Sequence, residues 1–117
     1  MARTVLIVDD HAPFRARARA LLEAEGFEVV GDVADGESAM VAAHALQPDV
    51  VLLDIQLPDA DGFAVAERLV TQADPPSVVL ISSRSAESYR HQLVSSSARG
   101  FIAKAELSGE CLGLLLD

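Results

Sequence analysis

The stretch PDVVLLD, residues 48–54, decides how this chain folds. Its apolar residues, 50–53, follow one another without a polar break, which is typical of a short strand buried on both faces of a sheet. The run then meets the carboxylate of Asp54. Because an unpaired charge is costly inside a core, Asp54 must lie where the strand emerges from it. Residues 55–62 contain proline and glycine and are predicted to form a loop.

The composition of the chain indicates a single domain with an aliphatic core. The chain has 117 residues, of which 50% are hydrophobic and 4% aromatic. A domain of this size buries roughly two-thirds of its unfolded surface, which is enough for a core without cross-links. The net charge of −9 argues against direct contact with nucleic acid, because no cluster of lysine and arginine could neutralise phosphates.

The sequence favours a cytoplasmic protein that makes no membrane contact. Its one cysteine, Cys111, excludes a disulfide framework and fits a reducing compartment. We expect Cys111 to be a small core or interface residue. The residues before the first strand lack the layout of a signal peptide. No apolar run approaches the ~20 residues that a membrane span needs.

Predicted strands and helices alternate along the chain. Five successive strand–helix pairs are typical of a parallel sheet that carries helices on both faces, with right-handed crossovers. In the helix at 86–96, three residues are predicted to face inward, and serines weaken its end: Tyr89, Leu93 and Val94. The strands are predicted at 4–8, 27–33, 50–54, 77–81 and 100–103, and the helices at 12–25, 36–46, 62–72, 86–96 and 107–116.

Four of the five predicted strands end in polar side chains. The carboxyl ends of parallel strands share one rim of a sheet, and ligands of open α/β sheets bind at that rim. The second strand ends without a comparable group, which fits an edge position and the strand order 2-1-3-4-5. The residues at the other strand ends are Asp9, Asp10, Asp54, Ser82 and Lys104.

These residue types together predict phosphoryl chemistry. Three neighbouring carboxylates repel one another and need a cation, and Mg²⁺ prefers oxygen ligands of this kind. Lys104 can pair with Asp54 at rest or with a phosphoryl oxygen later. Ser82 offers a hydroxyl to the same group. A carboxylate nucleophile beside a metal and a lysine is suited to forming an aspartyl phosphate.

Three segments resemble the receiver domains of response regulators, the CheY-like superfamily: VLIVDDH (5–11), PDVVLLDIQLPD (48–59) and GFIAK (100–104). The runs VDDHAPFR and GFIAKAELSGE are most similar to the NarL/FixJ, LuxR-type, branch. The resemblance covers residues 1–117 as one receiver domain. It implies a doubly wound (βα)5 flavodoxin-like three-layer sandwich, the fold with strand order 2-1-3-4-5. Ala105 departs from the family pattern, in which proline commonly follows the lysine.

The resemblance assigns the central roles at the strand ends. It implies that Asp54 accepts a phosphoryl group from a sensor histidine kinase. It also implies that Asp9 and Asp10 hold Mg²⁺ together with Asp54 and the backbone carbonyl of Gln56.

The resemblance further implies how the phosphoryl group is sensed. Lys104 contacts it, Ser82 moves toward it, and Phe101 is the aromatic switch partner. A plain core role for Phe101 stays open as an alternative. We also hypothesise that Gln56 and Arg84, each two residues beyond a site residue, flank the path of the hydrolytic water and set the lifetime of the phosphorylated state.

The expected function is a signalling switch that regulates transcription, and not an enzyme beyond its own phosphorylation and dephosphorylation. A homodimer is expected through the face formed by residues 86–96, 100–103 and 107–116. Contact with DNA requires a C-terminal output domain, which residues 1–117 do not include. Two alternatives remain: an interaction module that works without phosphate, and a Mg²⁺-dependent phosphohydrolase that uses Asp54 as nucleophile.

Overall fold

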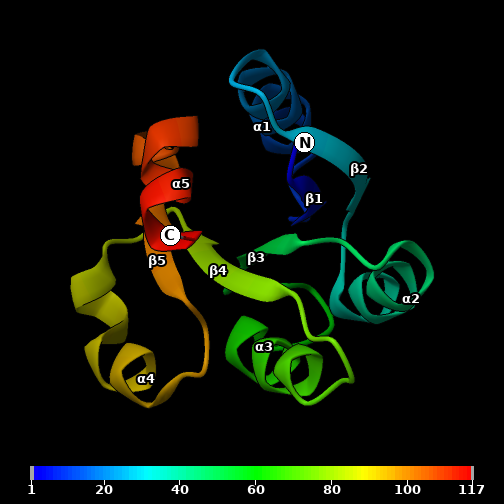
Figure 1. Ribbon diagram of the computed structural model, residues 1–117. Helices are drawn as coiled ribbons and strands as arrows, with labels where there is room; N and C mark the ends of the chain where they lie inside the picture. The colour runs from blue at the N-terminus through cyan, green and yellow to red at the C-terminus, as the bar shows by residue number, and fades with distance from the viewer. Residues whose placement is uncertain (1, 117) are drawn as a thin grey trace.

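The apolar runs of the sequence form the five strands of one parallel sheet (Figure 1). The computed structural model describes residues 2–116. The strand order is β2-β1-β3-β4-β5, which confirms the predicted order. The strands are β1 (Thr4–Val8), β2 (Glu28–Val33), β3 (Val50–Asp54), β4 (Ser77–Ser82) and β5 (Gly100–Ala103).

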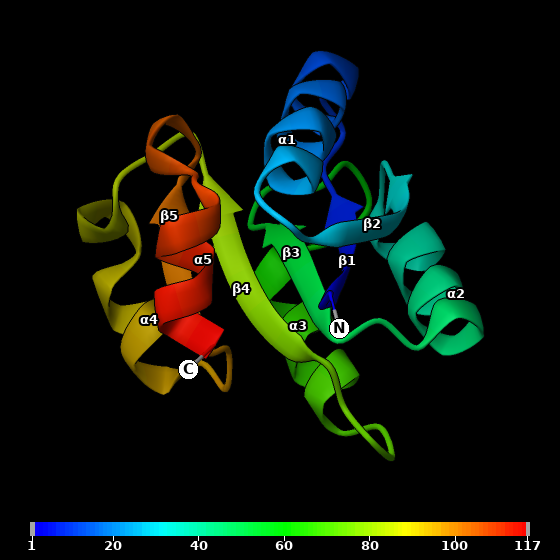
Figure 2. The same cartoon turned by 45° about the horizontal axis from the view of Figure 1, so that its top comes forward.

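Helices cover both faces of the sheet, as the alternating pattern predicts. Helices α1 (Ala12–Ala24) and α5 (Gly109–Leu116) cover one face, and α2 (Gly36–Leu46), α3 (Gly62–Val70) and α4 (Arg90–Ser95) cover the other. Figures 1 and 2 show the two layers with the sheet between them. Within residues 2–116, no helix combines the length and the apolar character needed to cross a membrane.

The central strand β3 supplies both hydrophobic cores. Val51 and Leu53 belong to the cluster under α2 and α3. Val50 and Leu52 belong to the cluster under α1 and α5. Since β1 pairs with one edge of β3 and β4 with the other, every residue of β3 is buried. Asp54 is therefore held at the end of the most enclosed strand.

The segment predicted as one helix at 86–96 is divided in the structure. A 3-10 turn, η1 (Ala86–Tyr89), precedes the short helix α4. Tyr89 is buried and Leu93 is partly buried, as predicted. Val94 is 83% exposed, so its predicted inward position is wrong. The change from 3-10 to α geometry at Tyr89 shifts the phase of the following side chains, because the two helices turn through different angles per residue.

The last helix also begins later than predicted. The 3-10 turn η2 (Lys104–Glu106) follows β5, and the extended backbone of Leu107 separates it from α5. Cys111 is exposed on α5, so of the two expected positions, core or interface, the core position is wrong and the interface position stays a prediction. The neighbouring Leu112 is buried instead.

Acidic residues fix the start of two helices beside β3. Asp35 accepts a hydrogen bond from the Ser38 N–H of α2 at 2.7 Å. Asp59, expected only as a loop residue, accepts the N–H groups of Gly36 (2.8 Å) and Glu37 (3.1 Å). Asp61, the residue directly before α3, accepts the Phe63 N–H of that helix at 2.8 Å. The hydrogen bonds of Asp59 and Asp61 thus connect the loop after β3 to the first turns of α2 and α3.

Candidate functional site

The ends of β1 and β3 bring three acids together, as the rim of a parallel sheet predicts. Carboxylate oxygens of Asp9, Asp10 and Asp54 all lie within 4.8 Å of one another. Asp9 and Asp54 are buried, whereas Asp10 is exposed. Lys104, the first residue after β5, lies against both buried acids. The structure therefore places four of the predicted site residues in one cluster.

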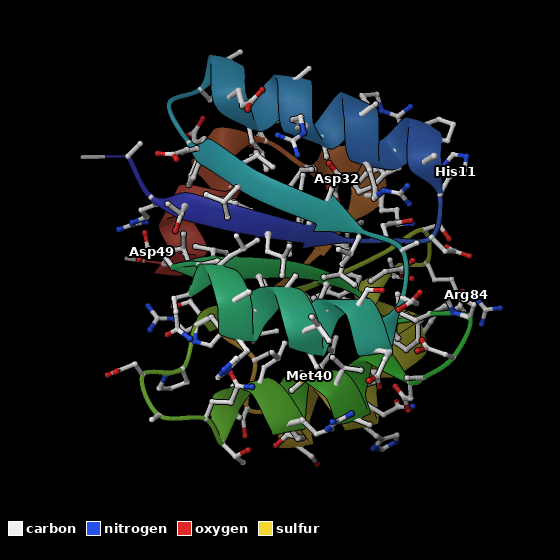
Figure 3. All side chains as sticks on the ribbon, turned by 90° about the vertical axis from the view of Figure 1, so that its right-hand side faces the viewer. His11, Asp32, Met40, Asp49 and Arg84 are labelled. Atoms are coloured by element: carbon white, nitrogen blue, oxygen red, sulfur yellow. The ribbon has the colours of Figure 1, made fainter. Side chains whose placement is uncertain are left out.

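Asp49 lies far from this cluster. Figure 3 shows His11 and Arg84 at one end of the sheet and Asp49 at the other. Asp49 is exposed and accepts hydrogen bonds from the backbone and the hydroxyl of Thr4, at 2.9 and 3.2 Å. Asp49 is therefore a surface acid remote from the site (Figure 3). His11 is the residue directly before α1, at the start of that helix.

Asp9 is fixed by groups on both sides. Its side chain is fully buried. Its Oδ1 accepts the His11 N–H at 2.8 Å, and its Oδ2 lies 2.6 Å from Lys104 Nζ. That ion pair is short, yet Oδ2 has no hydrogen-bond partner of standard geometry among the described residues. The positive charge of Lys104 thus balances the negative charge of this buried oxygen, which can still bind a cation.

Asp54 is held at the mouth of the same cluster. It is 4% exposed. Its Oδ1 accepts the Gln56 N–H at 3.1 Å, and Lys104 Nζ donates to its Oδ2 at 3.3 Å. Burial raises the pKa of the Asp54 carboxyl above its ordinary value of 3.8, and the negative charge of Asp9 raises it further. The Gln56 N–H and Lys104 act in the opposite direction, but they offset only part of this increase.

Replacing Asp54 by asparagine is expected to stabilise the metal-free domain at neutral pH. The pKa of Asp54 in the folded state lies above its ordinary value of 3.8. Protonation of Asp54 therefore stabilises the fold fully below about pH 3.8, and this stabilisation is lost as the pH rises through the folded-state pKa. Asparagine resembles the neutral form, so it avoids this loss. Urea unfolding without divalent ions should give Asp54→Asn the higher midpoint at about pH 7, and the advantage should shrink toward about pH 4. Equal midpoints at neutral pH would contradict the assigned shift.

Lys104 supplies the positive charge of the site and is the only lysine in the chain. Burial alone would lower the pKa of its ammonium group, but the carboxylates of Asp9 and Asp54 outweigh burial and raise the pKa above 10.5. Its Nζ also lies 4.9 Å from the ring centroid of Phe14, a cation–π contact from α1. The ammonium is therefore charged and held on three sides.

Ser82 ends β4 next to the acids, and its side chain is 1% exposed. Its Oγ accepts the Arg84 N–H at 3.0 Å and shares a hydrogen bond of 3.2 Å with the hydroxyl of Tyr89. The Tyr89 ring lies 6.3 Å from the ring of Phe101. Tyr89 is predicted from the sequence only to face inward on the helix at 86–96, and its contact with Ser82 was not predicted. Tyr89 lies seven residues after Ser82, and no sequence pattern at that spacing predicts a contact between the two side chains.

Arg15 is a second residue that the sequence analysis missed. Its Nη1 donates to the backbone carbonyl of Asp9 at 2.6 Å, and its Nε donates to Asp32 of β2 at 3.0 Å. Asp32 also accepts from Arg19, and that hydrogen bond is the largest cause of its lowered pKa. The network anchors the β1 end to β2, which otherwise adds no side chain to the acidic cluster.

The cluster fits a divalent cation of the Mg²⁺ type. Its three acids offer only oxygen ligands, and one of the buried oxygens, Oδ2 of Asp9, has no well-aligned hydrogen bond. Hard cations prefer such oxygen ligands, and Mg²⁺ is commonly bound by one or two carboxylates together with water. The exposed Asp10 gives a cation access from solvent.

The chain matches the family model described as "Response regulator receiver domain" over residues 5–112. The chain belongs to the response-regulator receiver family. This receiver domain is 36% identical over 106 residues to the "Virulence factors putative positive transcription regulator BvgA" of Bordetella pertussis; the match covers 91% of the receiver and 51% of BvgA. It is 33% identical to the transcriptional regulatory protein DegU of Brevibacillus brevis, covering 92% and 46% of the two chains.

Solved structures and other relatives agree with this assignment. The signal receiver domain of the response regulator NarL from Mycobacterium tuberculosis superposes with a TM-score of 0.84 at 32% identity, covering 98% of this receiver and 97% of that chain. The receiver is also 41% identical to part of a protein-glutamate methylesterase of Anaeromyxobacter dehalogenans, of which the match covers 30%. The receiver spans about half the length of the transcription regulators it matches. These relatives confirm the predicted family and its NarL-type branch.

Proposed function

We propose that this receiver domain is the phosphoacceptor of a two-component phosphorelay and that Asp54 takes the phosphoryl group from a sensor histidine kinase. One observation carries the proposal: a single ammonium group, Lys104 Nζ, lies 2.6 and 3.3 Å from two buried carboxylates, with a third, exposed acid beside them. The site changes only its own phosphorylation state, so we class the domain as a cytoplasmic signalling switch and not as an enzyme acting on other substrates.

The chemistry follows from the charges around Asp54. One of its carboxylate oxygens forms a bond to phosphorus while the bond from phosphorus to the kinase's histidine nitrogen breaks, and the electron pair leaves with that nitrogen. Attack requires the ionised carboxylate, and the Lys104 ammonium and the Gln56 N–H both favour that form. After transfer, Lys104 is placed to pair with a phosphoryl oxygen.

Mg²⁺ is the proposed cofactor. Asp9, Asp10 and Asp54 would hold it, and the backbone carbonyl of Gln56 is the fourth proposed ligand. When bound, the ion would offset the negative charge that gathers at the phosphoryl oxygens. The chain's own contribution is to fix Asp9 through the His11 N–H and the Arg15 contact to its carbonyl.

The proposed output is a change on the face formed by α4, β5 and α5, which lie together in Figure 1. An apolar hollow of about 420 Å³ lies on it, lined in part by Phe101, Leu114 and Leu115. Phosphorylation would shift Ser82 and Phe101 and so bias the packing of this face. We propose a second copy of the receiver as its partner. Regulation of transcription would act through a separate DNA-binding output domain, as the length of the relatives suggests.

Incubation with acetyl phosphate and Mg²⁺ tests the proposal. Mass spectrometry of the intact protein should show the addition of one phosphoryl group. Asp54→Asn should abolish it, because the nucleophile is gone. The matched control is Asp74→Asn, since Asp74 is exposed and has a left-handed backbone (φ 52°) that asparagine tolerates. The control should be modified like the wild type.

The remaining outcomes separate the alternatives. A folded wild type that acquires no phosphoryl group, with Mg²⁺ present, would favour an interaction module that works without phosphate. Sustained turnover of a phosphate ester would favour a phosphohydrolase. Decay of the modified protein after removal of acetyl phosphate also tests the lifetime hypothesis: Gln56→Ala and Arg84→Ala should each change the decay rate, since both side chains are exposed beside the site.

A further inference from the structure

The Ser82 hydroxyl already has partners in the resting structure. Its Oγ accepts the Arg84 N–H at 3.0 Å, which occupies one of its two acceptor positions. This bond leaves the Ser82 proton available for donation and one acceptor position open. The hydroxyl oxygen of Tyr89 lies 3.2 Å away, in a bond that either atom can donate. Since Ser82 and Tyr89 are both buried, bulk water does not replace this acceptor.

Tyr89 is held rigidly by the rings around it. Its side chain is 7% exposed. Its ring packs against Phe63 of α3 at 5.9 Å and against Phe101 of β5 at 6.3 Å, both tilted. Tyr89 ends η1 and directly precedes α4, in which no residue is buried. It is therefore the buried anchor of residues 86–95.

We infer that the Tyr89 hydroxyl accepts the Ser82 proton at rest and that Tyr89 is thereby a positioning residue for phosphoryl transfer, since it competes with the phosphoryl group on Asp54 for that proton. The inference rests on the proposed phosphorylation of Asp54. It adds a residue of the η1 turn to a site in which Asp9, Asp10, Asp54, Ser82 and Lys104 lie at strand ends.

Phosphorylation of Asp54 should move the Ser82 hydrogen bond from Tyr89 to the phosphoryl group. A hydrogen bond to an anionic phosphoryl oxygen is roughly twice as strong as one to a neutral hydroxyl, so phosphorylation draws the Ser82 proton away from Tyr89. The Tyr89 hydroxyl then loses its partner while it remains buried, which weakens the anchor of α4. The exchange of one hydrogen bond thus links the chemistry at Asp54 to the face formed by α4, β5 and α5.

The hydrogen bond between Ser82 and Tyr89 can be followed through the absorption of the tyrosine ring. Tyr89 is its only tyrosine, and it contains no tryptophan. Near-ultraviolet absorption at the red edge of the tyrosine band therefore reports on Tyr89 alone. We expect beryllofluoride with Mg²⁺ to shift this band in the wild type. Ser82→Ala should produce a shift of the same sign without beryllofluoride, whereas Ser83→Ala, which removes a neighbouring exposed hydroxyl, should leave the band unchanged.

A variant that lacks only the tyrosine hydroxyl tests the competition. Tyr89→Phe keeps the ring contacts with Phe63 and Phe101. Loss of a hydrogen bond worth roughly 1 kcal/mol should raise the affinity for beryllofluoride about fivefold, as measured by fluorine NMR. In a Ser82→Ala background the same change should have no effect, because the competing proton is absent. Circular dichroism checks that each variant is folded.

The outcomes distinguish this inference from the proposed function. Unchanged or weaker binding by folded Tyr89→Phe overturns the inference, as does a gain that persists without Ser82. An unshifted tyrosine band in Ser82→Ala also overturns it. If the wild type neither binds beryllofluoride nor acquires a phosphoryl group, the proposed function fails and the inference fails with it.

Discussion

Replacing Gly62 by alanine should destabilise the domain by about 3 kcal/mol, the upper end of the usual cost of overpacking. A Cβ at this position would lie 2.6 Å from the Cα of Ile55 and closer still to the backbone carbonyl oxygen of Asp54. Neither atom belongs to a flexible side chain, so the backbone itself has to move. The Gly62 N–H also donates to the Ile55 carbonyl at 2.7 Å, and this bond closes the loop after β3.

The same substitution should impair the site as well as the fold. The backbone that must shift carries Asp54, so phosphorylation by acetyl phosphate should slow even in conditions where the variant is folded. Urea unfolding gives the free energy of unfolding, and initial rates of mass gain give the second effect. Gly113→Ala is the matched control: nothing lies within 4 Å of its added Cβ. Alanine in that helix should stabilise the domain by about 0.5–1 kcal/mol. Equal stabilities for the two variants would contradict the close approach at Gly62.

Replacing Lys104 by methionine should cost about 3 kcal/mol at neutral pH, because removal of one partner leaves buried charges uncompensated. Asp9 and Asp54 are 0% and 6% exposed as side chains, and Lys104 is 17% exposed. Methionine keeps most of the apolar length of lysine, so packing changes little. Mg²⁺ should restore more stability to this variant than to the wild type, since a bound cation replaces the missing charge.

The matched control for Lys104 is Arg68→Met, which removes one positive charge from an exposed position on α3. Its free energy of unfolding should change by less than about 0.5 kcal/mol. Urea unfolding of both variants, with and without Mg²⁺, provides the comparison. If Lys104→Met is as stable as Arg68→Met in the absence of Mg²⁺, then the two buried acids do not depend on the lysine.

The acidic cluster was predictable because it depends on topology alone. Apolar runs of four or five residues identify the strands, and the residue after each run must lie at the carboxyl rim of a parallel sheet. Asp9, Asp54 and Lys104 follow from that rule without any knowledge of side-chain geometry. The family resemblance adds roles to these positions, and the strand order confirms the topology on which the rule depends.

The contacts made by helical residues were not predictable in the same way. Tyr89 reaches Ser82 because η1 is a 3-10 turn, and a helical pattern with an uninterrupted α period places Val94 inward instead. The long side chain of Arg15 on α1 reaches back to the Asp9 carbonyl. Local phase and side-chain reach both depend on packing, which sequence periodicity does not encode.

The solitary lysine of this chain makes the site chemically addressable. Apart from the amino terminus, Lys104 is the only primary amine, and it is partly exposed while it contacts both buried acids. Reductive methylation with an isotopically labelled reagent retains its charge and would place one NMR-visible group at the centre of the cluster. The resonance of that group would follow metal binding and phosphorylation without any engineered label.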